Sequence, residues 1–219
     1  MNDLKAKNRL NEFYGSQEQL RRYHRMYLTY LNTGSDAHPV LDLGCGFGAF
    51  MELLQESKVP VEGIDLAEEA VAECTAKGLH ATRDDALHFL ADKHGKYASI
   101  FCSHLIEHFN YGDACRLLSS MHEALINGGR VVLVTPNPAS LEVSEYFWLD
   151  PTHIRPYPLP LLLSMFEEAG FKVLEHGQQT APGLPRRGIP RRFLLRLVLG
   201  RHYGKVDSYI VGEKKSTSE

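Results

Sequence analysis

The chain has 219 residues, and its 43% hydrophobic content is enough for a sizeable core, which excludes disordered and collagen-like proteins and favours a single domain. It has 24 lysines and arginines against 27 aspartates and glutamates, a formal net charge of -3. That charge is unevenly distributed, because residues 181–205 hold seven basic and no acidic side chains, which leaves 17 - 27 = -10 for the remainder.

Membrane and disulfide signals are weak. No apolar run approaches the roughly 18 residues of a membrane span, since Arg196 interrupts the best late candidate. The first residues lack the apolar stretch of a secretory signal. Four cysteines lie far apart without a CxxC pair, which argues against a disulfide framework or a zinc knuckle. We therefore expect a cytoplasmic protein, with contact to the inner face of the membrane as an open alternative.

The N-terminal stretch predicts a helix. Ser16 and Gln19 have the spacing of a capping box, and apolar residues recur at helical spacing up to Leu31. The helical pattern covers residues 3–32, and a polar linker closes it. We expect residues 1–37 to form a helical cap on a domain that spans residues 38–219.

From Pro39 onward, short apolar runs alternate with helical patterns. Such alternation predicts parallel strands joined by right-handed helical crossovers, and therefore a doubly wound α/β fold. The expected strands are residues 40–43, 61–64, 80–82, 97–102 and 130–135, and the expected helices are 47–56, 67–77, 86–91 and a segment around 117–125 capped by Asn127-Gly128-Gly129. A helix at 161–169, strands at 171–175 and 207–212, and a disordered tail at 213–219 complete the expected elements.

A long irregular stretch, residues 137–160, interrupts this rhythm. It contains five prolines, the only tryptophan and a dense polar group at residues 150–157. Loops this long in a compact domain are usually functional. We expect it to be a substrate loop in which His153, Arg155 and Tyr157 contact the acceptor; a polar network on a surface loop is the alternative.

The clearest motif joins the first expected strand to the next helix. Gly44, Gly46 and Gly48 alternate there, and glycine lets the backbone approach a ligand closely while helix N-terminal amides stay free to bind it. The spacing also fits a dinucleotide fingerprint through Ala49, so the loop alone does not choose between cofactors.

Carboxylates around this loop narrow the choice of ligand. Asp65 ends the second strand, 65 - 44 = 21 residues after the first glycine, where a carboxylate accepts bonds from ribose hydroxyls. Asp85 follows the third strand, where it can contact an adenine amino group, and Asp42 adjoins the loop, where it can engage an amine directly or through water. The implied ligand is an adenosine with an ammonium group and no pyrophosphate.

Five segments in this order resemble the successive motifs of class I S-adenosylmethionine-dependent methyltransferases. They are VLDLGCGFG, EGIDL, RDDAL, IFCSHLIEHF and LINGGRVVLVTPNP, within about residues 38–137. The resemblance implies a Rossmann-like seven-stranded sheet of order 3-2-1-4-5-7-6, with an antiparallel last strand. It also implies S-adenosylmethionine as the cofactor.

The same resemblance implies a set of cofactor contacts. The three glycines line the methionine part, Asp65 binds the ribose, and position 104, which is His104 here, directs its backbone toward the cofactor. The full expected set is Asp42, Gly44, Cys45, Gly46, Gly48, Asp65, Leu66, Asp85, Ala86, Leu87, Ser103 and His104.

Three histidines are candidate catalytic residues. A sulfonium donor brings its own electrophile, so the enzyme must align a nucleophile, exclude water and, for a hydroxyl acceptor, remove a proton. A histidine suits that last task. His104 and His108 follow the fourth strand and His153 lies in the substrate loop, where α/β folds place ligands. A structural role is the alternative for each.

His104 to His108 also match the inverted zinc-protease signature H-x-x-E-H. That signature requires both histidines on one face of an established helix. Here the string begins directly after an expected strand, so we expect no metal at this motif.

The acceptor is less defined by the sequence. FWLDPTHIRPYP loosely resembles methyltransferases of bacterial glycan and cell-envelope biosynthesis, which implies a sugar hydroxyl, and Arg155 is available for a carboxylate or phosphate. The basic insertion, residues 181–205, is interpreted as a cap that attracts an anionic substrate, as an interfacial helix over 186–201 on anionic lipid, or as a solvated helix. RNA binding is disfavoured because the segment lacks interleaved aromatic residues.

The sequence therefore predicts methyl transfer to a small-molecule or glycan acceptor, by O-methylation. N-methylation and RNA methylation are the alternatives within the family. A nicotinamide-dependent oxidoreductase and a non-catalytic cofactor-binding protein are the alternatives outside it. The oligomeric state is not predicted.

Overall fold

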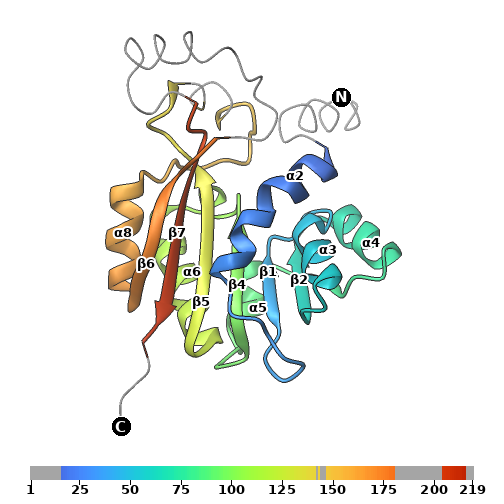
Figure 1. The fold of residues 1–219 in the computed structure, drawn as a ribbon. Helices are drawn as coiled ribbons and strands as arrows, with labels where there is room; N and C mark the ends of the chain where they lie inside the picture. The colour runs from blue at the N-terminus through green and yellow to red at the C-terminus, as the bar shows by residue number, and fades with distance from the viewer. Residues whose placement is uncertain (1–15, 142, 144–146, 181–203, 216–219) are drawn as a thin grey trace.

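A computed structural model describes residues 16–141, 143, 147–180 and 204–215. Their centre is a seven-stranded sheet of order β3-β2-β1-β4-β5-β7-β6 (Figure 1). The pairs from β3 to β5 are parallel, whereas β7 runs antiparallel to both β5 and β6. The order and direction expected from the family resemblance are confirmed.

The strands are β1 (Val40–Leu43), β2 (Val61–Asp65), β3 (Ala81–Arg83), β4 (Tyr97–Ser103), β5 (Leu125–Pro136), β6 (Phe171–Gln179) and β7 (Asp207–Lys214). The helices are α2 (Gln17–His24), η1 (Arg25–Tyr30), α3 (Ala49–Glu56), α4 (Glu68–Ala76), α5 (Ala86–Leu90), η2 (Ile106–His108), α6 (Tyr111–Ala124) and α8 (Leu159–Glu168), where η marks a 3-10 helix.

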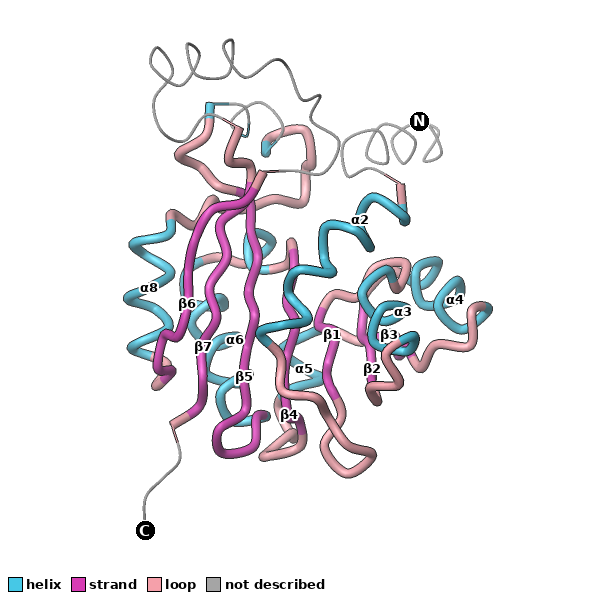
Figure 2. The backbone as a smooth tube through the Cα atoms, viewed as in Figure 1, coloured by secondary structure: helices cyan, strands magenta, loops and turns pink. Residues whose placement is uncertain are grey.

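Helices cover both faces of the sheet, as Figures 1 and 2 show. Strand residues alternate between the two layers: Leu41 and Leu43 join the core formed with α5, α6 and α8, whereas Val40 joins the core formed with α2, η1 and α3. A third, small cluster links α3 to α4 through Met51 and Cys74. Both faces are therefore buried, as a mainly parallel sheet requires.

The N-terminal helix begins as predicted and ends earlier. Ser16 and Gln19 form the reciprocal capping box. The α-helix stops at His24, continues as a 3-10 helix to Tyr30, and gives way to extended backbone at Leu31, so the prediction of one helix to residue 32 is corrected. Residues 1–15 lie outside the described part of the chain. Because α2 and η1 pack into the sheet's own core, the division at residue 37 stays a prediction.

Two further predictions near the strands are corrected. Helix α6 ends at Ala124, and Leu125 already pairs with Tyr97 in the sheet, so Asn127-Gly128-Gly129 lies within β5 rather than capping a helix. Strand β7 extends to Lys214, because Arg130 pairs with Glu213, so the expected disordered tail begins too early. Among the described helices, none combines the length and apolar character needed to cross a membrane.

Candidate active site

The turn from β1 into α3 is built on left-handed glycines. Gly44, Gly46 and Gly48 have φ of +80°, +50° and +81°, a region that disfavours side chains. A Cβ at Gly48 would lie 2.6 Å from the Leu79 side chain, whereas a Cβ at Gly46 would meet nothing within 4 Å. The loop is thus tightly packed on one side and open on the other, where a ligand can approach its backbone.

Asp65 fixes this loop to the end of β2. One carboxylate oxygen accepts a hydrogen bond from the Gly46 amide and the other from the Ala67 amide, each at 2.8 Å. Next to it, the Leu66 side chain is 66% exposed. The exposed leucine offers an apolar surface for a base, and the adjacent carboxylate offers hydrogen-bond acceptors for a ribose.

Two buried oxygen atoms near the loop have no hydrogen-bond partner among the described residues: Asp42 Oδ2 and Ser103 Oγ. Burial raises the pKa of Asp42 well above its usual range. Uncompensated buried polar atoms are unfavourable unless a ligand or water completes them. These residues fit a ligand that carries an ammonium group, the group that S-adenosylmethionine has in its methionine part.

The other predicted cofactor residues surround the same edge of the sheet. Asp85 caps α5 by accepting hydrogen bonds from the amides of Leu87 and His88 at 3.0 and 3.1 Å, and Ala86 is buried beneath it. Cys45 turns its side chain into the small cluster with Cys74, so only its backbone borders the loop. Nothing in these contacts conflicts with the expected adenine and methionine contacts, which stay predictions.

The substrate loop docks on the turn that follows β4. The amides of Ile154 and Arg155 donate to the Glu107 carbonyl oxygen at 2.9 and 3.2 Å. The Tyr157 hydroxyl donates to the Phe109 carbonyl oxygen at 2.9 Å. Residues nearly 50 positions apart therefore form one unit at the C-terminal edge of the sheet, beside the glycine loop.

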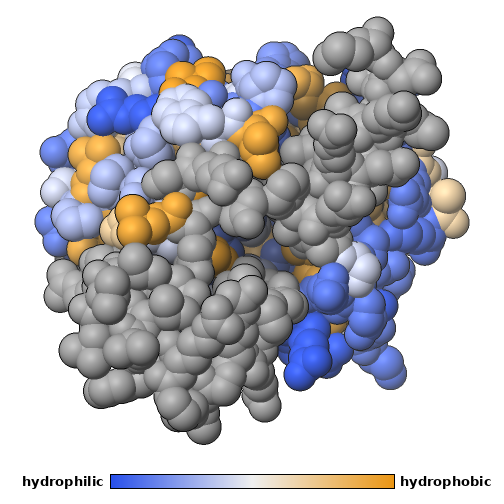
Figure 3. Space-filling model, turned by 90° about the horizontal axis from the view of Figure 1, so that it is seen from above, coloured by the Kyte–Doolittle hydropathy of each residue, from blue (hydrophilic) through white to orange (hydrophobic). Residues whose placement is uncertain are grey.

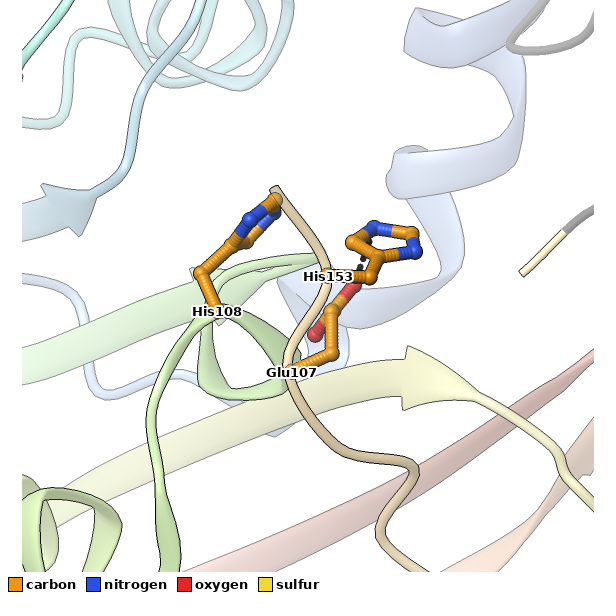
Figure 4. A group of neighbouring side chains, drawn as sticks. All are labelled: Glu107, His108 and His153. Atoms are coloured by element: carbon orange, nitrogen blue, oxygen red, sulfur yellow. Dashed lines mark ion pairs between the residues drawn. The ribbon is translucent and has the colours of Figure 1, made fainter. Parts of the chain in front are cut away.

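The Glu107 carboxylate lies at the centre of this unit and is fully buried. Its Oε2 accepts a hydrogen bond from Thr135 Oγ1 at 2.9 Å. Its Oε1 lies 3.4 Å from His104 Nδ1 and 4.0 Å from His153 Nε2. Two of the three predicted histidines, His104 and His153, thus converge on one glutamate, and Figure 4 shows His153 beside it.

His104 is held between two carboxylates. Its Nε2 lies 3.5 Å from Asp207 Oδ1, and Asp207 Oδ2 accepts a hydrogen bond from the Tyr23 hydroxyl at 2.6 Å. Burial alone would lower the pKa of His104, but Asp207 and Glu107 outweigh burial and raise it to about 10. The ring is therefore a fixed cation at neutral pH and a poor proton acceptor.

His108 and His153 lie together, with ring centroids 4.7 Å apart. His153 is buried, and its Nδ1 lies 2.7 Å from the Phe147 carbonyl oxygen. His108 is half-buried, and its Nδ1 lies 3.2 Å from the Thr152 carbonyl oxygen. For His153 the carbonyl, which can only accept, assigns the proton to Nδ1. His108 Nδ1 also lies 3.0 Å from the Thr152 hydroxyl, but this hydroxyl donates to Asp150 and therefore accepts from the ring, so both rings have a free Nε2 lone pair when neutral.

The two remaining predicted substrate residues have different positions. Arg155 is exposed, and its guanidinium lies over the rings of Tyr111 and Tyr157, at 5.3 and 5.7 Å from their centroids. Tyr157 belongs to the main core with no exposed surface, and its hydroxyl is already bonded. Its side chain therefore anchors the loop, and the proposed acceptor site omits it.

The H-x-x-E-H string does not form a zinc-protease helix. His104 has φ of +53° and precedes η2, a single 3-10 turn, so it does not share a helical face with His108. The cluster that could hold an ion instead combines Glu107 and His108 with His153, whose ligand atoms lie within 4.8 Å of one another. Within the string only Glu107 and His108 belong to it.

Sequence reasoning missed three polar residues of this edge. Glu107 was visible only as part of a motif, Asp207 only as the start of a strand, and Tyr23 only as an apolar position of a helix. Asp150 was recognised as part of a polar group, and its Oδ2 lies 4.0 Å from His153 Nε2. Only the dense polar group and the Glu-His pair gave a signal in the sequence.

The substrate loop contains exposed apolar side chains. Among the described large hydrophobic residues, Leu141, Trp148, Leu149 and Ile154 are each more than half exposed, and all belong to the substrate loop. Figure 3 views this edge, where hydrophobic residues stand among hydrophilic ones. Residues 181–203 of the basic insertion, including 186–201, lie outside the described residues, whereas Lys205 donates to the Gln178 carbonyl oxygen at 3.1 Å.

Comparison with known proteins agrees with this geometry. A family model described as a methyltransferase domain matches residues 14–176. A ubiquinone biosynthesis O-methyltransferase of Idiomarina loihiensis is 26% identical over 132 residues, 56% of this chain and 54% of the relative. An uncharacterized protein of Methanocaldococcus jannaschii is 30% identical over 135 residues, 62% of this chain and 55% of the relative. The chain thus spans about half the length of these curated relatives.

Solved structures resemble the chain over more of its length. A SAM-dependent methyltransferase from Archaeoglobus fulgidus superposes with a TM-score of 0.79 at 26% identity, over 93% of this chain and 97% of that one. An S-adenosylmethionine-dependent methyltransferase from Mesorhizobium loti has a TM-score of 0.65 at 18% identity, over 91% of this chain and 100% of that one, and shows the fold alone. With the methyltransferase-domain match over most of the chain and the glycine-loop geometry, the protein belongs to the class I S-adenosylmethionine-dependent methyltransferases.

Proposed function

We propose that this protein transfers a methyl group from S-adenosylmethionine to a hydroxyl oxygen of a small-molecule or glycan acceptor. The observation that supports O-methylation best is the group formed by Glu107, His108 and His153, which we call the histidine-glutamate group, beside the turn after β4. A hydroxyl acceptor must lose its proton as it attacks, and histidine is suited to remove it. The O-methyltransferase relatives support the same chemistry.

The cofactor, when bound, supplies an electrophilic methyl group, so the acceptor oxygen gains an O–C bond while the S–C bond breaks and its electron pair stays on sulfur. Asp65 and Asp85 would hold the ribose and adenine, and Asp42 the ammonium group. The fixed His104 ring and the docked loop orient the acceptor side and exclude water. The hydroxyl proton leaves through the histidine-glutamate group, in which His108 is the more exposed histidine.

The exposed apolar side chains of the substrate loop favour an acceptor that has an apolar part, such as a lipid-linked molecule. Trp148 and Ile154 are 64% and 55% exposed. A rigid aromatic side chain next to an acceptor site contributes affinity mainly by removing apolar surface from water. We expect Trp148→Ala to raise KM for a hydroxylated acceptor with an alkyl chain several-fold, and to leave KM for the same head group without the chain unchanged.

The direct test is a panel of methyl acceptors with matched hydroxyl, amine and RNA members. Methyl transfer is measured as S-adenosylhomocysteine formation, and the methylated product is identified by NMR. We expect product from hydroxyl acceptors, and His108→Ala to lower kcat by about 10² or more at neutral pH. The cofactor Kd should not change. His94→Ala serves as the matched control, since His94 is 68% exposed beside Glu123. Methyl transfer to amines or RNA alone would contradict O-methylation.

A further inference from the structure

We propose that the histidine-glutamate group is a binding site for one divalent transition-metal ion. The inference deepens the proposed function, on which it rests for the role of the ion. Glu107 and His108 come from the turn after β4, and His153 comes from the substrate loop, so the ion would join the two segments (Figure 4).

Two buried ligand atoms of the group, one on Glu107 and one on His153, lie opposite each other, and the His104 imidazolium approaches the Glu107 atom to 3.4 Å. Glu107 Oε1 and His153 Nε2 are 4.0 Å apart and buried, with side-chain exposures of 0% and 2%. Neither atom has a hydrogen-bond partner among the described residues. His104 balances part of the Glu107 charge, but the buried His153 Nε2 still lacks a partner among the described residues, which is unfavourable unless a cation completes it.

The separations of the ligand atoms fit a single ion. Ligand atoms about 2.1 Å from an ion are at most about 4.2 Å apart. The 4.0 Å separation of Glu107 Oε1 and His153 Nε2 therefore admits an ion between them. All ligand atoms of the group lie within 4.8 Å of one another, so a shift of at most about half an ångström would bring the half-buried His108 within reach of the ion.

The atom of each ligand that faces away from the proposed ion already has a hydrogen-bonding partner. His153 Nδ1 contacts the Phe147 carbonyl oxygen at 2.7 Å, and Glu107 Oε2 accepts from Thr135. His108 Nδ1 contacts the Thr152 carbonyl oxygen at 3.2 Å. Metal-binding histidines donate their other ring N–H in the same way, which fixes the tautomer and directs the free nitrogen at the ion.

The surrounding charges favour a cation. Asp150 Oδ2 lies 4.0 Å from His153 Nε2, while Asp150 Oδ1 accepts hydrogen bonds from the Thr152 amide and hydroxyl at 2.8 and 2.6 Å. Asp150 therefore adds a negative charge beside the group. The competing positive charge, His104, is neutralised from its other side by Asp207. Two imidazoles with carboxylates suit zinc, cobalt or iron better than magnesium or calcium.

An ion at this place would act on the acceptor. It would bind the hydroxyl oxygen as a Lewis acid, and the hydroxyl proton would leave to solvent before the oxygen attacks the methyl group. His108 and His153 would then be ligands rather than proton acceptors. The loss of activity in His108→Ala does not separate these two roles, so the test has to measure ion binding itself.

In the experiment, Co²⁺ alone is titrated into chelator-treated, tag-free protein without S-adenosylmethionine. Binding is monitored by visible absorption and by calorimetry. We expect one equivalent to bind and to give the absorption of a nitrogen- and oxygen-ligated cobalt ion. His153→Ala and His108→Ala should each weaken binding by about tenfold or more. His94→Ala, which removes an exposed histidine 3.7 Å from Glu123, should leave binding unchanged.

Equal Co²⁺ affinity in the wild type, His108→Ala and His153→Ala would overturn the proposal, as would the absence of stoichiometric binding by the wild type. Circular dichroism and the S-adenosylmethionine Kd of each variant show that it is folded, and His108→Ala keeps the test valid if the buried His153→Ala does not fold. Ion binding is measured without cofactor or acceptor. A failed methyl-transfer assay therefore bears on the proposed function alone.

Discussion

The cofactor side and the acceptor side of this site lie at the same edge of the sheet but are assembled differently. The cofactor side consists of short turns that follow β1, β2 and β3, each of which presents residues adjacent in sequence. Its key contact, from the Gly46 amide to Asp65, joins neighbouring strands. The acceptor side joins residues nearly 50 or even 184 positions apart, such as Tyr157 with Phe109 and Tyr23 with Asp207.

The two sides also differ in charge. On the cofactor side Asp65 and Asp85 accept hydrogen bonds from backbone amides, and Asp42 Oδ2 has no hydrogen-bond partner among the described residues, which suits a cationic ligand. On the acceptor side Asp207 and Glu107 contact side chains instead: Asp207 lies between Tyr23 and His104, and Glu107 between Thr135 and two histidines. One side is defined by backbone conformation and the other by a buried network, so each responds to a different kind of substitution.

Gly48→Ala should have the largest effect, and it tests the backbone side. The new Cβ would lie 2.6 Å from Leu79 Cδ1 and 2.9 Å from Cys74 Sγ, in a residue with φ of +81°. Strain and overpacking together should lower the free energy of unfolding by about 3 kcal/mol or more. Urea denaturation measures the loss, and calorimetry should detect little cofactor binding.

Gly46→Ala is the matched control, because its Cβ meets nothing within 4 Å although φ is +50°. It should lower the free energy of unfolding by only about 1–2 kcal/mol. It should still lower the affinity for the cofactor, since the alanine methyl group would occupy the open side of the loop. Equal destabilisation by both substitutions would contradict the packed and open sides assigned to this turn.

Most of the fold was predictable because the elements are local. Alternating apolar runs gave β1 at its exact bounds, and the family resemblance gave the strand order. The errors arose where tertiary pairing outweighed a local signal. Asn127-Gly128-Gly129 has the composition of a helix cap, but pairing of Leu125 with Tyr97 had already started the strand.

In the site, too, the residues in local sequence motifs were easier to predict than the contacts between distant segments. The motif residues of the cofactor side lie where the alternation of strands and helices puts them, in the turns after β1, β2 and β3. On the acceptor side, His153 was singled out from a polar loop, yet its neighbour Glu107 could not be paired with it from sequence spacing. The link from Tyr23 through Asp207 to His104 depends on the antiparallel β7, whose register brings Asp207 opposite Pro136.

The pH dependence of stability tests the network side. Because the folded-state pKa of His104 is raised to about 10, above the usual value near 6.5, its contribution to stability is complete below about pH 6.5. It is lost as the pH rises through about 10. Stability should therefore fall across this window, with a slope of at most about 1.4 kcal/mol per pH unit.

Asp207→Asn should flatten this slope, because it removes one of the two carboxylates that hold the imidazolium. Asp36→Asn removes the same charge from an exposed linker position and should leave the slope as it is. Urea denaturation at several pH values, in the presence of a chelator, measures both. A wild-type stability that does not change between pH 7 and 10 would contradict the paired imidazolium.

Asp42→Asn should have the smallest effect on stability, and it should stabilise the protein, whereas the glycine substitutions destabilise it. Asp42 is 2% exposed, its Oδ2 has no hydrogen-bond partner among the described residues, and burial raises its pKa. An ionised carboxylate in this position destabilises the protein at neutral pH, so the neutral amide should raise the free energy of unfolding by on the order of 1 kcal/mol.

The same substitution should lower the affinity for S-adenosylmethionine, because the amide no longer attracts the ammonium group of the cofactor. Calorimetry at low and high salt should show a lower affinity in both. A protein that becomes more stable while binding its cofactor less well would indicate that this carboxylate is retained for the ligand and not for the fold. A loss of stability without a change in affinity would instead place Asp42 among the structural residues of β1.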